Sequence, residues 1–134
     1  MTTRTPTAIV LTIPGYPAYS LSPNARSHWA VKQRETKDAH WQVKQALGDM
    51  PINPITTPYR LHWTIYLERG GKKRDPDNAI ACLKAHMDAL VREGILPGDS
   101  PRWLIDTPTI EQIIWGTHRG EARITVRIEP QEEA

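Results

Sequence analysis

The sequence predicts an α+β fold: a two-layer sandwich in which a mixed four-stranded sheet carries two helices on one face. Residues 59–67 alternate apolar and polar side chains with the period of two of a half-buried strand. Residues 77–92 place apolar side chains at helical spacing instead. With the flanking segments the order is strand, helix, strand, helix, strand, strand, which favours one mixed sheet with both helices on one side.

The length and composition predict one domain over residues 1–134, with residues 129–134 as a frayed acidic tail. A chain of 134 residues is large enough for one core, and 39% hydrophobic with 24% charged residues is typical of a soluble protein. No apolar run reaches the length of a membrane span, and the first residues lack the apolar centre of a signal peptide. We therefore expect a cytoplasmic protein with no membrane partner.

The N-terminal half predicts two strands around one helix. Residues 7–13 are rich in β-branched side chains and precede Pro14-Gly15, which predicts a strand that ends in a turn. A helix is predicted from residues 22–24 to Leu47, before Gly48, and the alternating strand over 59–67 follows. The first part of this helix carries a basic, mostly solvated face of Arg26, His28, Lys32, Arg34 and Lys37.

The C-terminal half predicts a central helix, a turn and two strands. The helix runs over residues 77–92 and stops at Gly94, and Pro97-Gly98 then turns the chain. Residues 109–115 and 122–129 are the strands, joined around residues 116–120. On a helical wheel Asp77, Lys84 and Asp88 line up along the edge of the apolar stripe, so these polar side chains border the core.

Carboxylates and cations gather around the central helix. Asp75 and Asp77 flank Pro76 at its start, and Asp99 lies in the turn after it, while Arg69, Lys72, Lys73 and Arg74 come immediately before. Carboxylate oxygens are the ligands that Mg²⁺ prefers, and a basic loop attracts phosphate. The combination indicates metal-dependent phosphodiester hydrolysis, in which Lys84, on the same side as Asp77, adds positive charge in the transition state.

Each residue also has a structural explanation. In this explanation Asp75 or Asp77 is a helix cap, Lys84 and Asp88 are a surface pair four residues apart, and Asp99 is a turn residue. The basic segment is then a solvated loop. Taken singly, each structural role is the better explanation, whereas their occurrence together favours a functional site.

A longer pattern resembles a known family. Around the central helix the chain reads Arg74-Asp75-Pro76-Asp77-Asn78, followed by Lys84, Asp88-Ala89-Leu90, Gly94 and Asp99, with Pro23-Asn24, Arg26 and His28 upstream. This pattern, which spans most of the chain, closely resembles the RusA family of Holliday junction resolvases, common in phages and prophages. Two features depart from it: Lys84 lies seven residues after Asp77, where some members have four, and Gly98-Asp99 stands where the family often has two acids.

The resemblance implies a homodimeric endonuclease that uses Mg²⁺, with Mn²⁺ as an alternative, to make paired nicks in four-way DNA junctions during recombination and repair. No organic cofactor is implied, and the setting is a bacterial or phage-infected cell. The metal-binding acids are Asp75, Asp77 and Asp99, and the catalytic lysine is Lys84. Asn78 and Asp88 are expected to support the site, and DNA contacts are expected from Arg26, His28, Arg69, Lys72, Lys73 and Arg74.

Two other functions stay open. One is a metal-dependent nuclease for flaps, replication forks or RNA, and the other is an inert junction-binding or phage DNA-packaging accessory protein. The formal net charge of +2 does not exclude DNA, because residues 1–67 sum to +4 and residues 68–134 to −2. Much of that acidity belongs to the aspartates and the tail, and bound metal would neutralise the former.

Overall fold

The computed structural model describes residues 8–15, 29–48, 53–67, 72–114 and 122–131, and it confirms the α+β fold. In chain order the elements are β1 (Ile9–Pro14), α1 (Trp29–Leu47), β2 (Tyr59–Leu67), α2 (Pro76–Cys82), α3 (Lys84–Arg92), β3 (Thr109–Ile114) and β4 (Arg123–Pro130). The predicted helix start near residues 22–24 and the connection over 116–120 lie outside the described residues.

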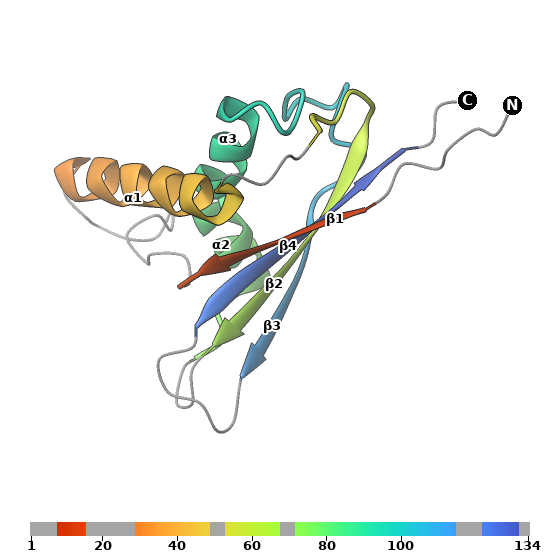
Figure 1. Ribbon diagram of the computed structural model, residues 1–134. Coiled ribbons are helices and arrows are strands. Elements are labelled where there is room, and N and C mark those ends of the chain that lie inside the picture. The colour runs from red at the N-terminus through yellow and green to blue at the C-terminus, as the bar shows by residue number, and fades with distance from the viewer. Residues whose placement is uncertain (1–7, 16–28, 49–52, 68–71, 115–121, 132–134) are drawn as a thin grey trace, which may run out of the picture.

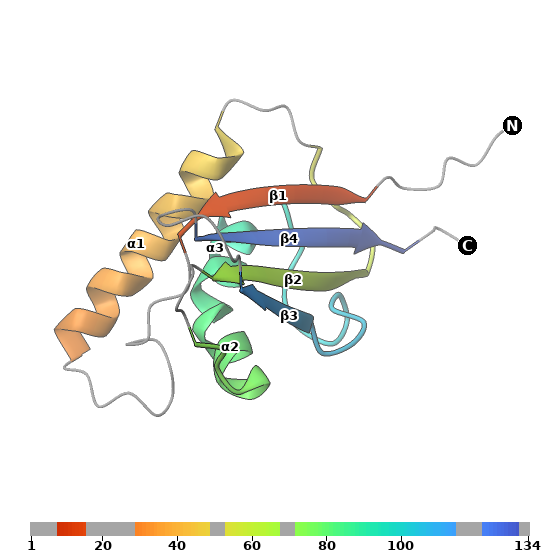
Figure 2. The ribbon, with the colours of Figure 1, turned by 90° about the horizontal axis from the view of Figure 1, so that it is seen from below.

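The four strands form one mixed sheet in the order β1-β4-β2-β3. β4 pairs antiparallel with both β1 and β2, whereas β3 runs parallel to β2. A parallel neighbour requires a crossover connection, and α2 and α3 lie within it. The helices all lie on one side of the sheet, as Figures 1 and 2 show, so the predicted two layers are confirmed. No helix in the described part of the chain is long and apolar enough to cross a membrane.

The core lies between the sheet and the helices. The alternating side chains of β2 are buried at Tyr59, Leu61, Trp63, Ile65 and Leu67. β4 contributes Ile124, Val126 and Ile128, helices α1 and α3 contribute Val43 and Leu90, and Leu83 is added from the junction of α2 and α3, all at most 1% exposed. Burying one such side chain stabilises the fold by about 1.5–3 kcal/mol before losses of conformational entropy. This packing fixes the helices that carry the predicted site residues.

The predicted central helix is divided at Leu83 into α2 and α3. The amide of Leu83 is shared between the carbonyls of Ala79 (3.2 Å) and Ile80 (3.0 Å), and the residue itself is 1% exposed. No glycine or proline stands at this position to announce the division in the sequence. The predicted end is confirmed: Gly94 adopts φ +82°, and the amide of Ile95 bonds the carbonyl of Leu90, as in a Schellman cap.

Candidate active site

The segment that leads into α2 is held against β3 by its backbone. The amide of Arg74 donates to Oε1 of Gln112 at 2.8 Å, and Nε2 of Gln112 donates to the carbonyl of Arg74 at 2.7 Å. The guanidinium of Arg74 donates to Sγ of the buried Cys82 at 3.2 Å. Burial raises the pKa of the Cys82 thiol, against the opposing effect of Arg74. Arg74, predicted as a DNA contact, therefore also has a structural role.

This clamp places Asp75 and Asp77 at the start of α2. Asp75 is the N-cap residue, with φ −55° and ψ 138°, and its carbonyl accepts the amide of Ala79 at 3.0 Å. Its side chain makes no capping hydrogen bond. Asp75 therefore caps the helix through its backbone carbonyl, and its carboxylate does not have the capping role considered above. Both carboxylates are exposed beside the positive end of the helix dipole. A fixed backbone thus presents two solvent-facing acids.

A second anchor holds the turn that carries Asp99. The hydroxyl of Tyr59, a fully buried residue at the start of β2, donates to the carbonyl of Gly98. Burial raises the pKa of Tyr59 to about 12, and the nearby carboxylate of Asp99 adds to the increase. Gly98 is required here because a Cβ at this position would lie 2.8 Å from Cδ1 of Trp103. Asp99 itself is exposed.

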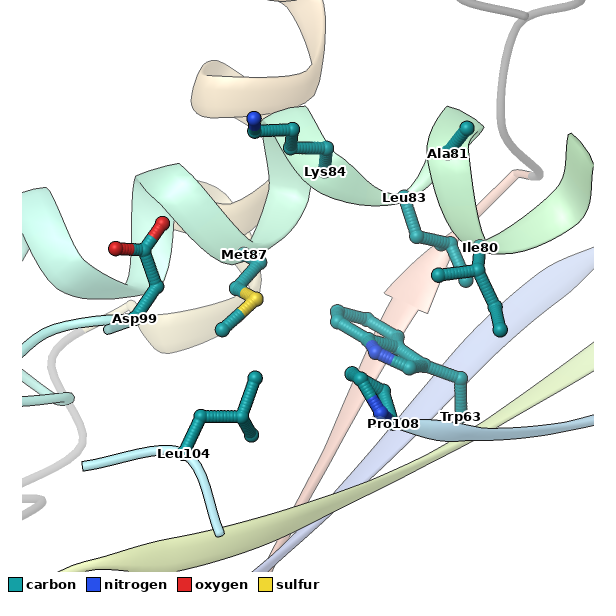
Figure 3. Close-up of a pocket in the computed structure, with 9 residues that line it drawn as sticks. All are labelled: Trp63, Ile80, Ala81, Leu83, Lys84, Met87, Asp99, Leu104 and Pro108. Atoms are coloured by element: carbon teal, nitrogen blue, oxygen red, sulfur yellow. The ribbon is translucent and has the colours of Figure 1, made fainter. Parts of the chain in front are cut away.

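Lys84 and Asp99 line one cavity, although fifteen positions separate them in the chain. The cavity has a volume of about 280 Å³. Its remaining lining is apolar: Trp63, Ile80, Ala81, Leu83, Met87, Leu104 and Pro108. Figure 3 shows Lys84 and Asp99 on the α3 side, with Trp63 and Pro108 across the space on the sheet side. A cation and a carboxylate therefore border an apolar hollow.

The cavity lining includes both positions at which the family pattern can place its lysine, four and seven residues after Asp77. The residue four positions after Asp77 is Ala81, and both Ala81 and Lys84 line the same space. Asp77 precedes Ala81 by one turn, so it lies on this side of α2. Lys84 is exposed, and among the described residues no ion pair joins it to Asp88, which leaves its ammonium group available to a ligand.

The donor chemistry of the three aspartates suits magnesium, since all are exposed carboxylates. However, within the described ranges no group of three or more histidine, cysteine or acidic side chains is arranged to hold a metal ion. The aspartates therefore do not form a closed cage. Mg²⁺ commonly takes one or two carboxylates together with substrate phosphates and water, so an incomplete set of protein ligands is compatible with it.

The remaining predicted residues divide into two groups. Lys72 and Lys73 are exposed next to Arg74, and Asn78 and Asp88 are half-buried on α2 and α3. Arg26, His28 and Arg69 lie outside the described residues. These assignments remain predictions.

The outer face of α1 includes Arg34 and Lys37, which belong to the basic face predicted from the sequence, and also Trp41 and Lys44, which were not predicted. Trp41 is 62% exposed, and at about 100° per residue it points opposite the buried Ala39 and Val43. Exposed Arg34, Lys37 and Lys44 share this outer side with it. An exposed tryptophan among cations is a combination that nucleic-acid-binding surfaces use for base stacking and phosphate contact. This outer face could have been found from the sequence by drawing a helical wheel over the whole predicted helix, as far as Leu47.

The chain matches no protein-family model and no curated protein sequence. The resemblance to RusA resolvases therefore rests on the residues quoted above.

Proposed function

We propose that this protein is a magnesium-dependent endonuclease of the RusA type that cuts branched DNA, with four-way junctions as its substrate and a homodimer as its working form. The observation that supports the proposal best is the shared cavity of Lys84 and Asp99. The sequence motif assigns both residues to one site, and the fold brings them to one place. The proposed setting is the cytoplasm of a bacterial or phage-infected cell, in recombination and repair.

In this proposal each group has a distinct task. Asp75, Asp77 and Asp99 are the residues that would hold magnesium, and the ion would supply an activated water and positive charge. Lys84 places its ammonium against the scissile phosphate and stabilises the charge that develops there. Exposed Lys72 and Lys73, beside the acids, hold neighbouring phosphates.

Gln112 and Tyr59 act as positioning residues. Gln112 fixes the backbone that leads to Asp75, and Tyr59 fixes the turn that presents Asp99. Both are anchored in adjacent parallel strands, β3 and β2. The distance between the two acidic segments is therefore set by the sheet, and small errors in such distances cost large factors in rate.

The decisive experiment is cleavage of a synthetic four-way junction with Mg²⁺ by the unmodified protein and by Asp77→Asn. Asp38→Asn, which removes an exposed carboxylate from α1, is the matched control. We expect paired nicks from the unmodified protein and the control, and a loss of at least about 100-fold in Asp77→Asn, the scale of removing one electrostatic contact to the transition state. Equal cutting of linear duplex and junction would remove the resolvase assignment and leave a nuclease of different specificity.

One observation favours a second candidate, an inert junction-binding accessory protein: the absence of a three-ligand acidic group in the described part of the chain. Such a protein would bind the junction with the same basic segments and cut nothing. Junction binding without any cleavage in Mg²⁺ or Mn²⁺ would establish this function in place of the nuclease.

A further inference from the structure

The cavity beside Lys84 and Asp99 has the wrong lining for a phosphate. Seven of its nine lining residues carry apolar side chains, including the indole of Trp63, the thioether of Met87 and the ring of Pro108. A phosphate or a sugar placed among them would lose its hydrogen bonds to water, which is unfavourable without replacement partners. A flat, weakly polar ring suits this surface, because it packs against apolar side chains such as the half-buried Ile80, Leu104 and Pro108. Trp63 is 2% exposed and therefore contributes little contact area.

The charged groups on its border define what such a ring is attached to. Lys84 is exposed at the edge of the cavity and would meet an anionic group there, whereas the exposed carboxylate of Asp99 on the same border would repel one in the absence of a bound cation. A nucleotide combines both features, since it joins a flat base to a phosphate through one sugar. The mixed lining therefore matches one nucleotide better than it matches a bare anion or an aliphatic ligand.

We propose that this cavity receives the base of the nucleotide next to the phosphate that is cut. The inference rests on the proposed function, because it takes Lys84 as the residue that contacts this phosphate. In an uninterrupted duplex the base is paired and stacked, and its extrusion costs a few kcal/mol. At the crossover of a four-way junction the bases stay paired, but each loses its continuous stacking on one side, so extrusion of a base there costs less. The cavity would thus contribute to selectivity for branched DNA.

Ala81 offers a way to fill the cavity with little damage to the fold. It lines the space, is half-buried, and lies within α2, where leucine is also a good helix former. Ala81→Leu adds an apolar side chain and removes none from the core. Ala30→Leu makes the same change at an exposed position in the first turn of α1 and serves as the matched control.

The test measures binding in the presence of a chelator, so that no cleavage is needed. Four-way junctions carry 2-aminopurine, or an abasic site, at each of the three nucleotides on either side of the crossover. We expect the unmodified protein and Ala30→Leu to change the 2-aminopurine signal at one position. An abasic site there should weaken binding roughly 5- to 150-fold, the range of one stacked base. Ala81→Leu should bind intact and abasic junctions equally.

A second measurement observes the cavity directly. Titration with a short single-stranded oligonucleotide should shift the NMR signals of the Met87 methyl group and the Trp63 indole. If the protein cuts junctions with Mg²⁺ while these signals stay unchanged and every abasic junction binds normally, the base site is refuted and the nuclease stands. If the protein neither binds nor cuts junctions, the proposed function fails, and the base site fails with it.

Discussion

The buried histidine between α1 and α3 leads to a prediction about acid sensitivity. His86 is 1% exposed; its Nε2 lies 3.3 Å from Oε1 of Gln42, and its Nδ1 has no hydrogen-bond partner among the residues that the structure describes. Burial, and then the neighbouring His40, lower the pKa of His86 to about 4. The folded protein therefore keeps this ring neutral at pH values where the unfolded chain protonates it. Acid then favours the unfolded state.

The magnitude follows from the two pKa values. Above about pH 6.5 the ring is neutral in both states, so it has no effect on the free energy of unfolding. Between about 6.5 and 4 the unfolded chain binds more protons than the folded protein, so stability falls as pH falls. From pH 7.5 to 5 the loss is about 2 kcal/mol, and it levels off near 3 kcal/mol below the folded pKa of about 4.

Urea unfolding of the unmodified protein and of His86→Leu at pH 7.5 and pH 5 isolates this contribution, since all other titrating groups are common to both. We expect the unmodified protein to lose about 2 kcal/mol more than the variant. His40→Gln removes the second cause of the lowered pKa, so it should reduce the loss in part. Equal pH dependence in the unmodified protein and His86→Leu, or an NMR titration of the His86 ring near pH 6.5, would refute this account.

Three further predictions concern the site and the outer face of α1. Gly98→Ala forces a Cβ to 2.8 Å from Trp103, so it should displace Asp99 and reduce junction cleavage at least about 10-fold, at a stability cost of about 1–3 kcal/mol. The control Gly94→Ala is strained at φ +82° but has open space around it, so it should lose about 1 kcal/mol in urea unfolding and keep the cleavage rate of the unmodified protein. Lys84→Ala should lower the single-turnover rate about 100-fold, and adding Ala81→Lys should restore part of it, because both positions line one cavity; no recovery would show that only position 84 reaches the phosphate. Lys37→Ala should reduce the salt dependence of junction binding by about one counterion, and Trp41→Ala should weaken binding about 5-fold or more at every salt concentration, as fluorescence anisotropy can measure; unchanged binding by both variants would exclude this face.

The sequence predicted the strands well because each is half-buried. Alternation over residues 59–67 is required when one face of a sheet packs on helices, and β2 occupies this whole range. The neighbours of each strand could not be predicted in the same way. β3 and β4 follow one another in the chain, yet β2 lies between them, because β3 joins the sheet in parallel after the α2–α3 crossover. Such an order depends on long-range packing and leaves no local pattern.

The charged motif residues of the candidate site could be predicted from the sequence. The residues that hold their backbone in place could not. Lys84 and Asp99 stand out in the sequence as a lysine and an acid near a helix and a turn. Gln112 is one polar residue inside a strand, and Tyr59 begins an ordinary alternating pattern. Their roles arise from contacts across 38 and 39 residues of sequence, which no short window contains.

In the proposed site the backbone is held firmly while the carboxylates are exposed. The backbones on either side of the proposed site are fixed by hydrogen bonds from β2 and β3, whereas the carboxylates of Asp75, Asp77 and Asp99 are exposed to solvent. A purely structural acid would use its oxygens to cap or brace the fold, and the Asp75 side chain makes no capping hydrogen bond. Holding the backbone firmly while leaving the carboxylate oxygens to solvent costs the fold little and keeps them available to a ligand. Gln112→Leu and Tyr59→Phe should therefore lower cleavage by displacing Asp75 and Asp99, and a high Mg²⁺ concentration should restore only part of the rate.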